Sequence, residues 1–202
     1  MRRSLLALPF ALLPLAMAQA HEAHDHAHEH QHEHEHAHGS LGAHEHGVAQ
    51  LNVVLDGKDL ELELESPAMN LVGFEHLASS DADKAKVAAV RQQLVQPTKL
   101  FGLPQAAGCS ETAQELESPL FADQPAPEHE HEHEHAHESE HQHSDIHAHY
   151  QLTCTAPGKL AGIDLTPLFQ AFPATRTINV QLIGPNGQKG VESTPAKAMV
   201  AF

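Results

Sequence analysis

The sequence predicts an α+β domain, built on a largely antiparallel sheet with short helices, that carries two histidine-rich segments. Several short runs alternate apolar and polar residues, as strands with one buried face do. Ser-Pro and Thr-Pro pairs open short helical patterns between these runs. Twenty of the 21 histidines lie in residues 21–46 and 128–149, and neither segment contains a lysine or an arginine. The unusual chemistry of the chain is therefore confined to these two segments.

The first twenty residues have the pattern of a secretory signal peptide. Arg2 and Arg3 form a basic start, an apolar run follows over residues 5–17, and Ala18-Gln19-Ala20 supplies a small-x-small cleavage signal. The apolar run is too short to span a bilayer. We therefore expect cleavage after Ala20, export to the periplasm and no membrane insertion.

A β-hairpin is predicted just after the first histidine-rich segment. Apolar residues alternate with polar ones on both sides of Asp56-Gly57, a common turn dipeptide. The alternating apolar positions are Ala49, Leu51, Val53, Leu55, Leu60, Leu62 and Leu64. Glutamates 61, 63 and 65 fall on the opposite face, and we interpret them as a solvated strand face rather than as a cation site.

Helices are predicted at two places after the hairpin. Ser66-Pro67 predicts a short helix capped by Ser66 and running toward Phe74. A second helix should begin at Ser80-Asp81 and end before Pro97. Its predicted buried face consists of Val87, Val90 and Leu94. Residues 100–121 contain many glycines and prolines, and we expect one strand there, near Cys109.

The sequence from the end of the second histidine-rich segment onward predicts three strands and one more helix. Alternation from Ile146 to Cys154 indicates a strand, and Thr166-Pro167 indicates a helix that ends before Pro173. A strand at 178–182 leads into the turn 185–187, and a last strand leads to Phe202. The predicted organisation is a disordered tail at 21–43 and a single α+β domain at 44–202, with a flexible histidine- and glutamate-rich insertion at about 123–144.

The net charge of the chain argues against nucleic acid as a partner, and its two cysteines favour a disulfide. The net charge is −16 with histidine neutral, aromatic residues make up 4% and tryptophan is absent, so nucleic acid is excluded as a partner. The only cysteines are Cys109 and Cys154. In an oxidising compartment such a pair forms a disulfide, although two metal-binding thiolates are the alternative. A disulfide would tie both ends of the second histidine-rich segment to the folded domain.

The histidine-rich segments have the composition of metal-binding tracts. Imidazole nitrogen suits Zn²⁺ and also Ni²⁺ and Cu²⁺, and histidine at every second position lets several rings gather around one ion through small loops. At three to four ligands per ion, the capacity is on the order of five or six ions. Both faces of the alternating pattern are polar, so we expect disorder. The predicted ligands of these flexible tracts are His21, His24, His26, His28, His30, His32, His34, His36, His38, His129, His131, His133, His135, His137, His141 and His143.

An ordered site is predicted where the tracts join the domain. His147 and His149 are two residues apart on a strand, so their rings point to one face about 6.6 Å apart. His44 and His46 lead into the first strand, and His76, the only histidine outside the tracts, is a further candidate. For His76 a hydrogen-bonded histidine at a helix end is the competing interpretation.

No enzyme is predicted. The HEHEH runs match the H-E-x-x-H pattern of zinc proteases only because histidine and glutamate alternate, and the tracts have no apolar face to pack as the protease helix does. No nucleophile elbow, P-loop or dinucleotide fingerprint occurs elsewhere in the sequence.

Several strings resemble the ZrgA-type periplasmic zinc-binding proteins of Gram-negative bacteria. They are HEHGVAQLNVVLDG, SPAMNLVGFEH, LFGLPQAAGC, Tyr150-x-x-x-Cys154, LFQAFP and VQLIGPNGQ, in order from His44 to the C-terminus. The resemblance implies a role in zinc acquisition, a flexible zinc-binding region, cooperation with a zinc ABC importer or its periplasmic binding protein, and a disulfide between Cys109 and Cys154.

The predicted function is a periplasmic scavenger or buffer that binds several Zn²⁺ ions and passes zinc to an importer. The alternative is sequestration of excess zinc, nickel or copper. Copper(I) handling through thioethers is disfavoured because only Met69 and Met199 follow the predicted cleavage site.

Overall fold

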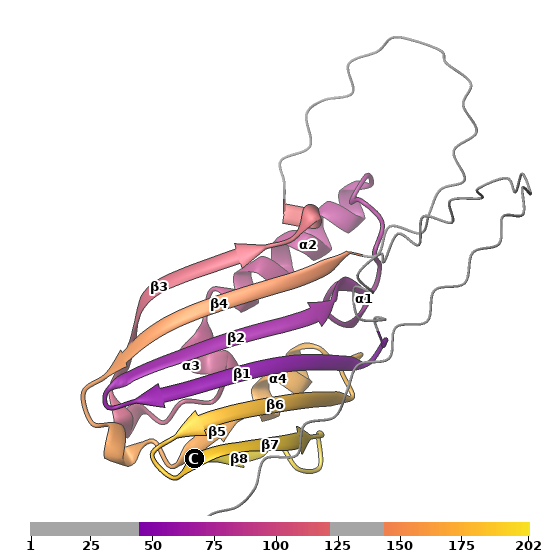
Figure 1. The fold of residues 1–202 in the computed structure, drawn as a ribbon. Coiled ribbons are helices and arrows are strands. Elements are labelled where there is room, and N and C mark those ends of the chain that lie inside the picture. Colours follow the sequence, from indigo (N-terminus) through magenta and orange to yellow (C-terminus); the bar gives the residue numbers. More distant parts are fainter. Residues whose placement is uncertain (1–44, 122–143) are drawn as a thin grey trace, which may run out of the picture. The chain divides into compact units, whose positions relative to one another are not determined.

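The computed structural model describes residues 45–121 and 144–202, and a six-stranded sheet dominates this part of the chain (Figure 1). The strand order is β3-β4-β2-β1-β6-β7, and β5 and β8 form a separate two-stranded sheet. The strands are β1 (Val48–Asp56), β2 (Asp59–Pro67), β3 (Cys109–Glu117), β4 (Asp145–Cys154), β5 (Gly162–Asp164), β6 (Thr177–Gly184), β7 (Gly187–Ser193) and β8 (Met199–Ala201). The helices are α1 (Ala68–Leu71), α2 (Asp81–Leu94), α3 (Pro97–Leu100) and α4 (Thr166–Ala171), with short 3₁₀ turns η1 (Gln105–Ala107), η2 (Pro119–Phe121) and η3 (Pro157–Lys159).

The α+β class and the largely antiparallel sheet are confirmed. Every neighbouring pair of the large sheet is antiparallel except β1 and β6, which run parallel. The predicted hairpin is β1 and β2, joined by Gly57 and Lys58 between the paired residues Asp56 and Asp59. Gly57 has a φ of +60°, a conformation that glycine adopts without a steric cost. Sequence alternation could not predict the parallel pair, because it says nothing about which strands are neighbours.

One face of the large sheet is buried and apolar, and the other is exposed or half-buried. One face consists of fully buried apolar side chains such as Leu62, Tyr150 and Val180, and helices α2, α3 and α4 lie on this side in Figure 1. The opposite face, which we call the open face, carries the exposed or half-buried side chains that alternate with them. The strict alternation along β2 and β4 follows from the two-residue period of a strand packed on one side only.

Helix α2 matches its prediction. Ser80 is the N-cap, and its hydroxyl accepts a hydrogen bond from the main-chain N–H of Asp83 at 3.1 Å. The predicted face of Val87, Val90 and Leu94 is buried. At the other end of the helix, the Tyr150 hydroxyl donates to the carbonyl oxygen of Leu94 at 2.9 Å. Burial raises the pKa of Tyr150, with a smaller contribution from Glu111, so this phenol stays protonated as a hydrogen-bond donor.

The prediction of a helix capped by Ser66 is wrong. Strand β2 continues through Pro67, which pairs with Asp145 of β4, and α1 is a single turn without a side-chain cap. Ser66 is fully buried, and its hydroxyl oxygen accepts a hydrogen bond from Asn70 Nδ2 at 3.2 Å. Pairing with β4 therefore overrides the local Ser-Pro signal, because it satisfies the strand backbone and buries the serine.

Asn70 joins the beginning of β1 to the end of β2. Its Oδ1 accepts a hydrogen bond from the N–H of Gly47 at 2.6 Å, and its Nδ2 donates to the carbonyl of Val48 at 2.9 Å as well as to Ser66. The side chain is 2% exposed. The buried amide of Asn70 therefore holds the chain where it enters the sheet, and Ser66, four residues earlier, is one of its hydrogen-bond partners.

The predicted disulfide is confirmed. Cys109 and Cys154 face each other at the same register of β3 and β4, with their Cα atoms 3.8 Å apart. The segment that connects β3 to β4 leaves from the other end of this strand pair, where Glu117 is paired with His147. Strand pairing rather than the disulfide thus holds the two ends of the connection next to each other. The predicted tail at 21–43 and the predicted insertion at about 123–144 lie outside the described residues, except for Ser144, which is buried next to β4.

Candidate metal centre

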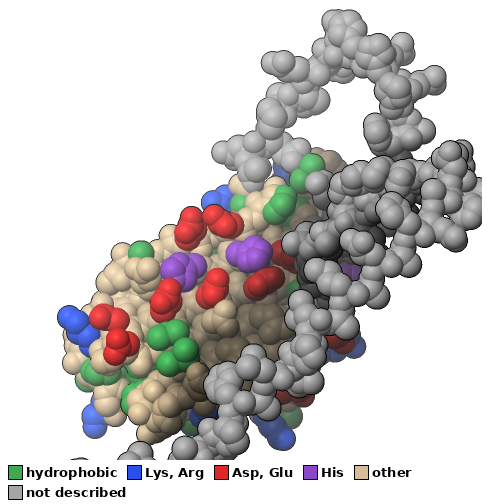
Figure 2. Space-filling view, in the orientation of Figure 1, with side chains coloured by type: hydrophobic (Ala, Val, Ile, Leu, Met, Phe, Trp, Pro, Cys, Tyr) green, Lys and Arg blue, Asp and Glu red, His purple; other side chains and the backbone are tan. Residues whose placement is uncertain are grey.

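Strand β4 presents two imidazoles on the open face. His147 and His149 are two residues apart in the strand, so both side chains point away from the buried core. Figure 2 shows two histidine side chains on this face, surrounded by acidic side chains. The predicted strand-borne histidine pair is therefore present, in the arrangement that the alternation indicated.

Each of these histidines lies between two glutamates on the neighbouring strands. His149 pairs with Glu63 of β2 and Glu115 of β3, and His147 pairs with Glu65 and Glu117 in the same way. Residues directly opposite on adjacent strands have Cβ atoms about 4.5–5.5 Å apart. The register therefore builds two successive rows of carboxylate, imidazole and carboxylate across β2, β4 and β3.

A hydrogen bond links His149 to a carboxylate outside its own row. Nε2 of His149 lies 2.6 Å from Oε1 of Glu61, the carboxylate diagonal to it on β2. Glu63 in turn accepts a hydrogen bond from Nδ2 of Asn52 at 3.0 Å. One imidazole nitrogen of this row is thus already engaged by a carboxylate, as it is in many proteins where a carboxylate orients a metal-ligating histidine.

The row around His147 contains a group of potential metal ligands. One ligand atom each of Glu65, Asp145 and His147 lie within 4.8 Å of one another, and no other group of three or more such side chains meets this condition among residues 45–121 and 144–202. Glu65 faces His147 across the strand pair, and Asp145 precedes it by two residues on the same face. One imidazole and two carboxylates are ligands that Zn²⁺ accepts.

A shallow depression of about 310 Å³ follows these rows. It is lined by Glu61, Glu63, Glu115, Glu117, His147, Ala148 and His149. Ala148 points to the core, so the open face between the two histidines has only main chain at its floor. Strands β2, β3 and β4 contain no lysine or arginine. The depression is therefore lined by carboxylate and imidazole groups, which attract cations.

His46 and His76, the predicted ligands that the structure describes outside β4, do not belong to this group. His46 Nε2 lies 2.9 Å from Oε1 of Glu75, and its carbonyl oxygen accepts a hydrogen bond from Arg176. The His76 ring stacks on Phe74 at a centroid distance of 4.7 Å, and its Nδ1 lies 3.0 Å from the carbonyl oxygen of Leu77. His76 thus fits the hydrogen-bonded alternative. His44 and the tract histidines lie outside the described residues.

Sequence reasoning missed Glu65 and Asp145 as candidate ligands. The sequence favours a solvated strand face for Glu65 and gives no signal for Asp145. The alternation of both strands places these residues on polar faces, but only the register Glu65↔His147 brings those faces together. That pairing joins residues 82 positions apart, so local pattern carries no signal for it.

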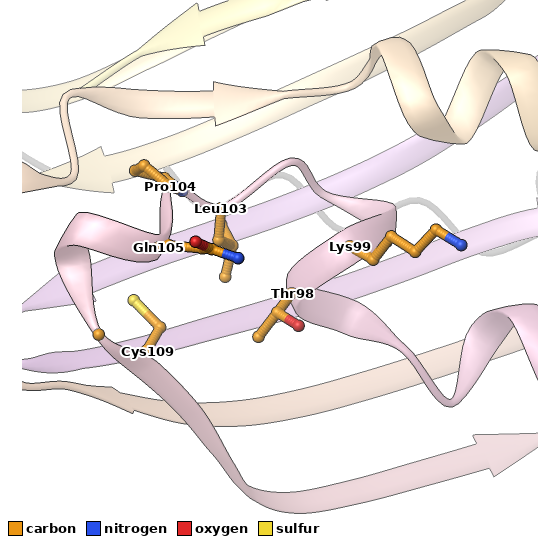
Figure 3. A pocket seen from close by; sticks show the side chains of 7 residues that line it. Thr98, Lys99, Leu103, Pro104, Gln105 and Cys109 are labelled. Carbon is orange, nitrogen blue, oxygen red and sulfur yellow. The ribbon is translucent and has the colours of Figure 1, made fainter.

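A second cavity, of about 420 Å³, lies beside the disulfide (Figure 3). Its lining residues are Thr98, Lys99, Leu103, Pro104, Gln105, Gly108 and Cys109. The sulfur of Cys109 is already bonded to Cys154, and Lys99 is the only charged residue in the lining. This cavity therefore has no set of side chains suited to a metal ion.

The fold and the open face define a class of α+β protein whose exposed sheet surface combines histidines with carboxylates. Within that class, the chain belongs to the ZrgA family of zinc uptake proteins, whose sequence pattern matches residues 43–202. The match includes every described element and confirms the resemblance seen in the sequence. No curated protein matches the chain. No helix within residues 45–121 and 144–202 is long and apolar enough to cross a membrane.

Proposed function

We propose that this protein is a periplasmic zinc-binding protein that captures Zn²⁺ and supplies it to a zinc importer. The observation that carries the proposal is the concentration of twenty histidines in two segments without lysine or arginine, on a chain of a zinc uptake family. We call residues 21–46 and 128–149 the histidine-rich segments. They supply the capacity, and the folded body supplies a fixed frame for them.

Chemistry supports a buffer rather than a single tight site. Neighbouring imidazoles are interchangeable ligands, so an ion can move between them by exchanging one ligand at a time. The glutamates among them raise the local concentration of cations. The capacity expected of the two segments is on the order of five or six ions, at three to four ligands each. Such a store fills and empties in response to supply.

Two features support a periplasmic location. The first twenty residues have the signal-peptide pattern, and the Cys109–Cys154 disulfide suits an oxidising compartment. Transfer to a zinc ABC importer, either directly or through its periplasmic binding protein, would give the captured ions a destination. Catalysis has no role in this proposal, because capture and transfer require only ligand exchange.

Growth of a deletion strain tests the proposal. Under zinc chelation, we expect the strain to fail and wild-type protein to restore growth. A full-length variant in which the 16 histidines of residues 21–38 and 129–143 are replaced by glutamine, which we call the histidine-depleted variant, should not restore it. His76→Gln is the matched control and should restore growth fully.

The opposite phenotype would support sequestration instead. If the strain grows normally under chelation but fails in excess zinc, nickel or copper, the supply role is wrong and the protein protects the periplasm from metal. Normal growth under both conditions contradicts both roles.

A further inference from the structure

We propose that Glu65, Asp145 and His147 form an ordered site for one divalent transition-metal ion on the open face, separate from the tract histidines of residues 21–38 and 129–143. The assignment of Zn²⁺ as its natural ion rests on the proposed function, whereas the site itself rests on the geometry. Their ligand atoms already lie within 4.8 Å of one another.

Only side-chain movement separates this geometry from a bound state. Tetrahedral ligands at 2.0–2.1 Å from Zn²⁺ lie about 3.3 Å from one another. The three ligand atoms must therefore approach by roughly 1.5 Å at most. Glu65 and His147 are exposed and Asp145 is half-buried, so rotation about side-chain bonds can close this gap without moving the strands.

The backbone that carries these ligands is held in place from both sides. Immediately before Asp145, Ser144 is 3% exposed; its carbonyl accepts a hydrogen bond from the N–H of Ala68 at 2.8 Å, and its hydroxyl donates to the carbonyl of Glu75 at 2.8 Å. On the other strand, Ser66 follows Glu65 and is fully buried. Binding therefore orders side chains only, which lowers its entropic cost.

The surrounding charge favours a cation at this position. Glu117 faces His147 from β3, and Glu63 is next to Glu65 on the open face of β2. Neighbouring carboxylates repel one another, and a divalent ion relieves several such contacts at once. The described residues of β2, β3 and β4 provide no lysine or arginine to do so.

Three protein ligands leave a coordination position open. A site with an open position exchanges its ligands readily, whereas a site with four protein ligands is closed. Glu117, directly opposite His147, is the nearest candidate in the register for a fourth ligand, and water or a donor from another molecule can take the same position. The site is thus suited to accept an ion and to release it.

His149 is not part of this site. Its Nε2 is engaged by Glu61 at 2.6 Å, and it belongs to the next row of the sheet. The proposal therefore differs from a site built on the pair of strand-borne imidazoles, and one substitution distinguishes the two.

The experiment uses the histidine-depleted variant, which keeps the full chain and all of the folded body. Equilibrium dialysis against Zn²⁺ should find one ion bound per chain. Glu65→Gln, Asp145→Asn or His147→Gln in this background should each weaken that binding by at least about tenfold. Glu192→Gln, an exposed strand carboxylate on β7, and His149→Gln are the matched controls and should retain the ion within about twofold. Far-UV circular dichroism melts establish that each variant is folded.

Three outcomes would overturn the inference. The first is a folded histidine-depleted variant that binds no zinc while the wild-type protein binds several ions; this leaves the proposed function intact. The second is retention of the ion by Glu65→Gln and Asp145→Asn. The third is loss through His149→Gln, which would assign the ion to the imidazole pair. Failure of the wild-type protein itself to bind zinc would instead contradict the proposed function.

Discussion

Replacing Asn70 with alanine should destabilise the folded body more than loss of the Tyr150 hydroxyl or of the Ser80 N-cap. The substitution removes three hydrogen bonds, to Gly47, Val48 and Ser66, of 2.6, 2.9 and 3.2 Å. At about 1 kcal/mol net for each bond, the free energy of unfolding should fall by about 3 kcal/mol. The buried N–H of Gly47 loses its acceptor, which adds to the cost rather than reducing it.

Urea denaturation of the metal-free protein, followed by far-UV circular dichroism, measures this loss. Thermal unfolding gives a second measure of the same loss. A folded body of this size loses roughly 2–4 °C of melting temperature per kcal/mol, so the expected decrease in melting temperature is about 6–12 °C. Asn52→Ala is the control, because Asn52 is exposed and donates one hydrogen bond, to Glu63. That change should cost less than about 0.5 kcal/mol. Equal costs at the two positions would refute the assigned role of Asn70.

Three further predictions concern stability. Tyr150→Phe keeps the ring but leaves the last carbonyl of α2 without its 2.9 Å donor, and urea denaturation should show a loss of about 1–2 kcal/mol; an unchanged midpoint contradicts the bond. Cys109→Ser combined with Cys154→Ser opens a loop of 45 residues, and the expected loss is about 4 kcal/mol, matched by reductant treatment of the wild type. Ser80→Ala removes the N-cap of α2 and should cost about 1 kcal/mol at pH 7. A second hydrogen bond, from the Ser80 hydroxyl to the Asp83 carboxylate, lowers the pKa of Asp83. The contribution of this second bond exists above the ordinary carboxyl pKa and is lost as pH falls through the lowered one, so the difference between variant and wild type should shrink, but not vanish, at acid pH. A constant difference would argue against this contact.

The elements that the sequence predicted well are those with strong local signals. The alternation of leucine and glutamate in β2 identifies both its conformation and its buried face, and Ser80 with Asp81 identifies the start of α2. Ser66-Pro67 has a comparable local signal, but the helix cap that it predicts is absent because strand pairing with β4 decides the conformation there. Local patterns predict structure only where no distant partner competes with them.

The residues of the candidate site are likewise predictable only where their role does not depend on a distant strand partner. The pair His147 and His149 is predictable from the sequence because residues i and i+2 of a strand point to one face. Glu65 was interpreted as solvated because its role depends on the register between β2 and β4, and Asp145 lies where that register ends. The sequence predicts one last strand leading to Phe202, whereas the structure has two, β7 and β8, in different sheets. Most residues of β7 are exposed, so this edge strand has little apolar periodicity to detect.

The central claim is that imidazoles of the two histidine-rich segments hold most of the zinc. Native mass spectrometry of the zinc-saturated, untagged protein tests it most directly, because the bound ions are counted on the intact chain. The wild type should bind on the order of five or six ions in all, one of them on the folded body, and the histidine-depleted variant should retain only that one. An undiminished ion count in that variant would contradict the account.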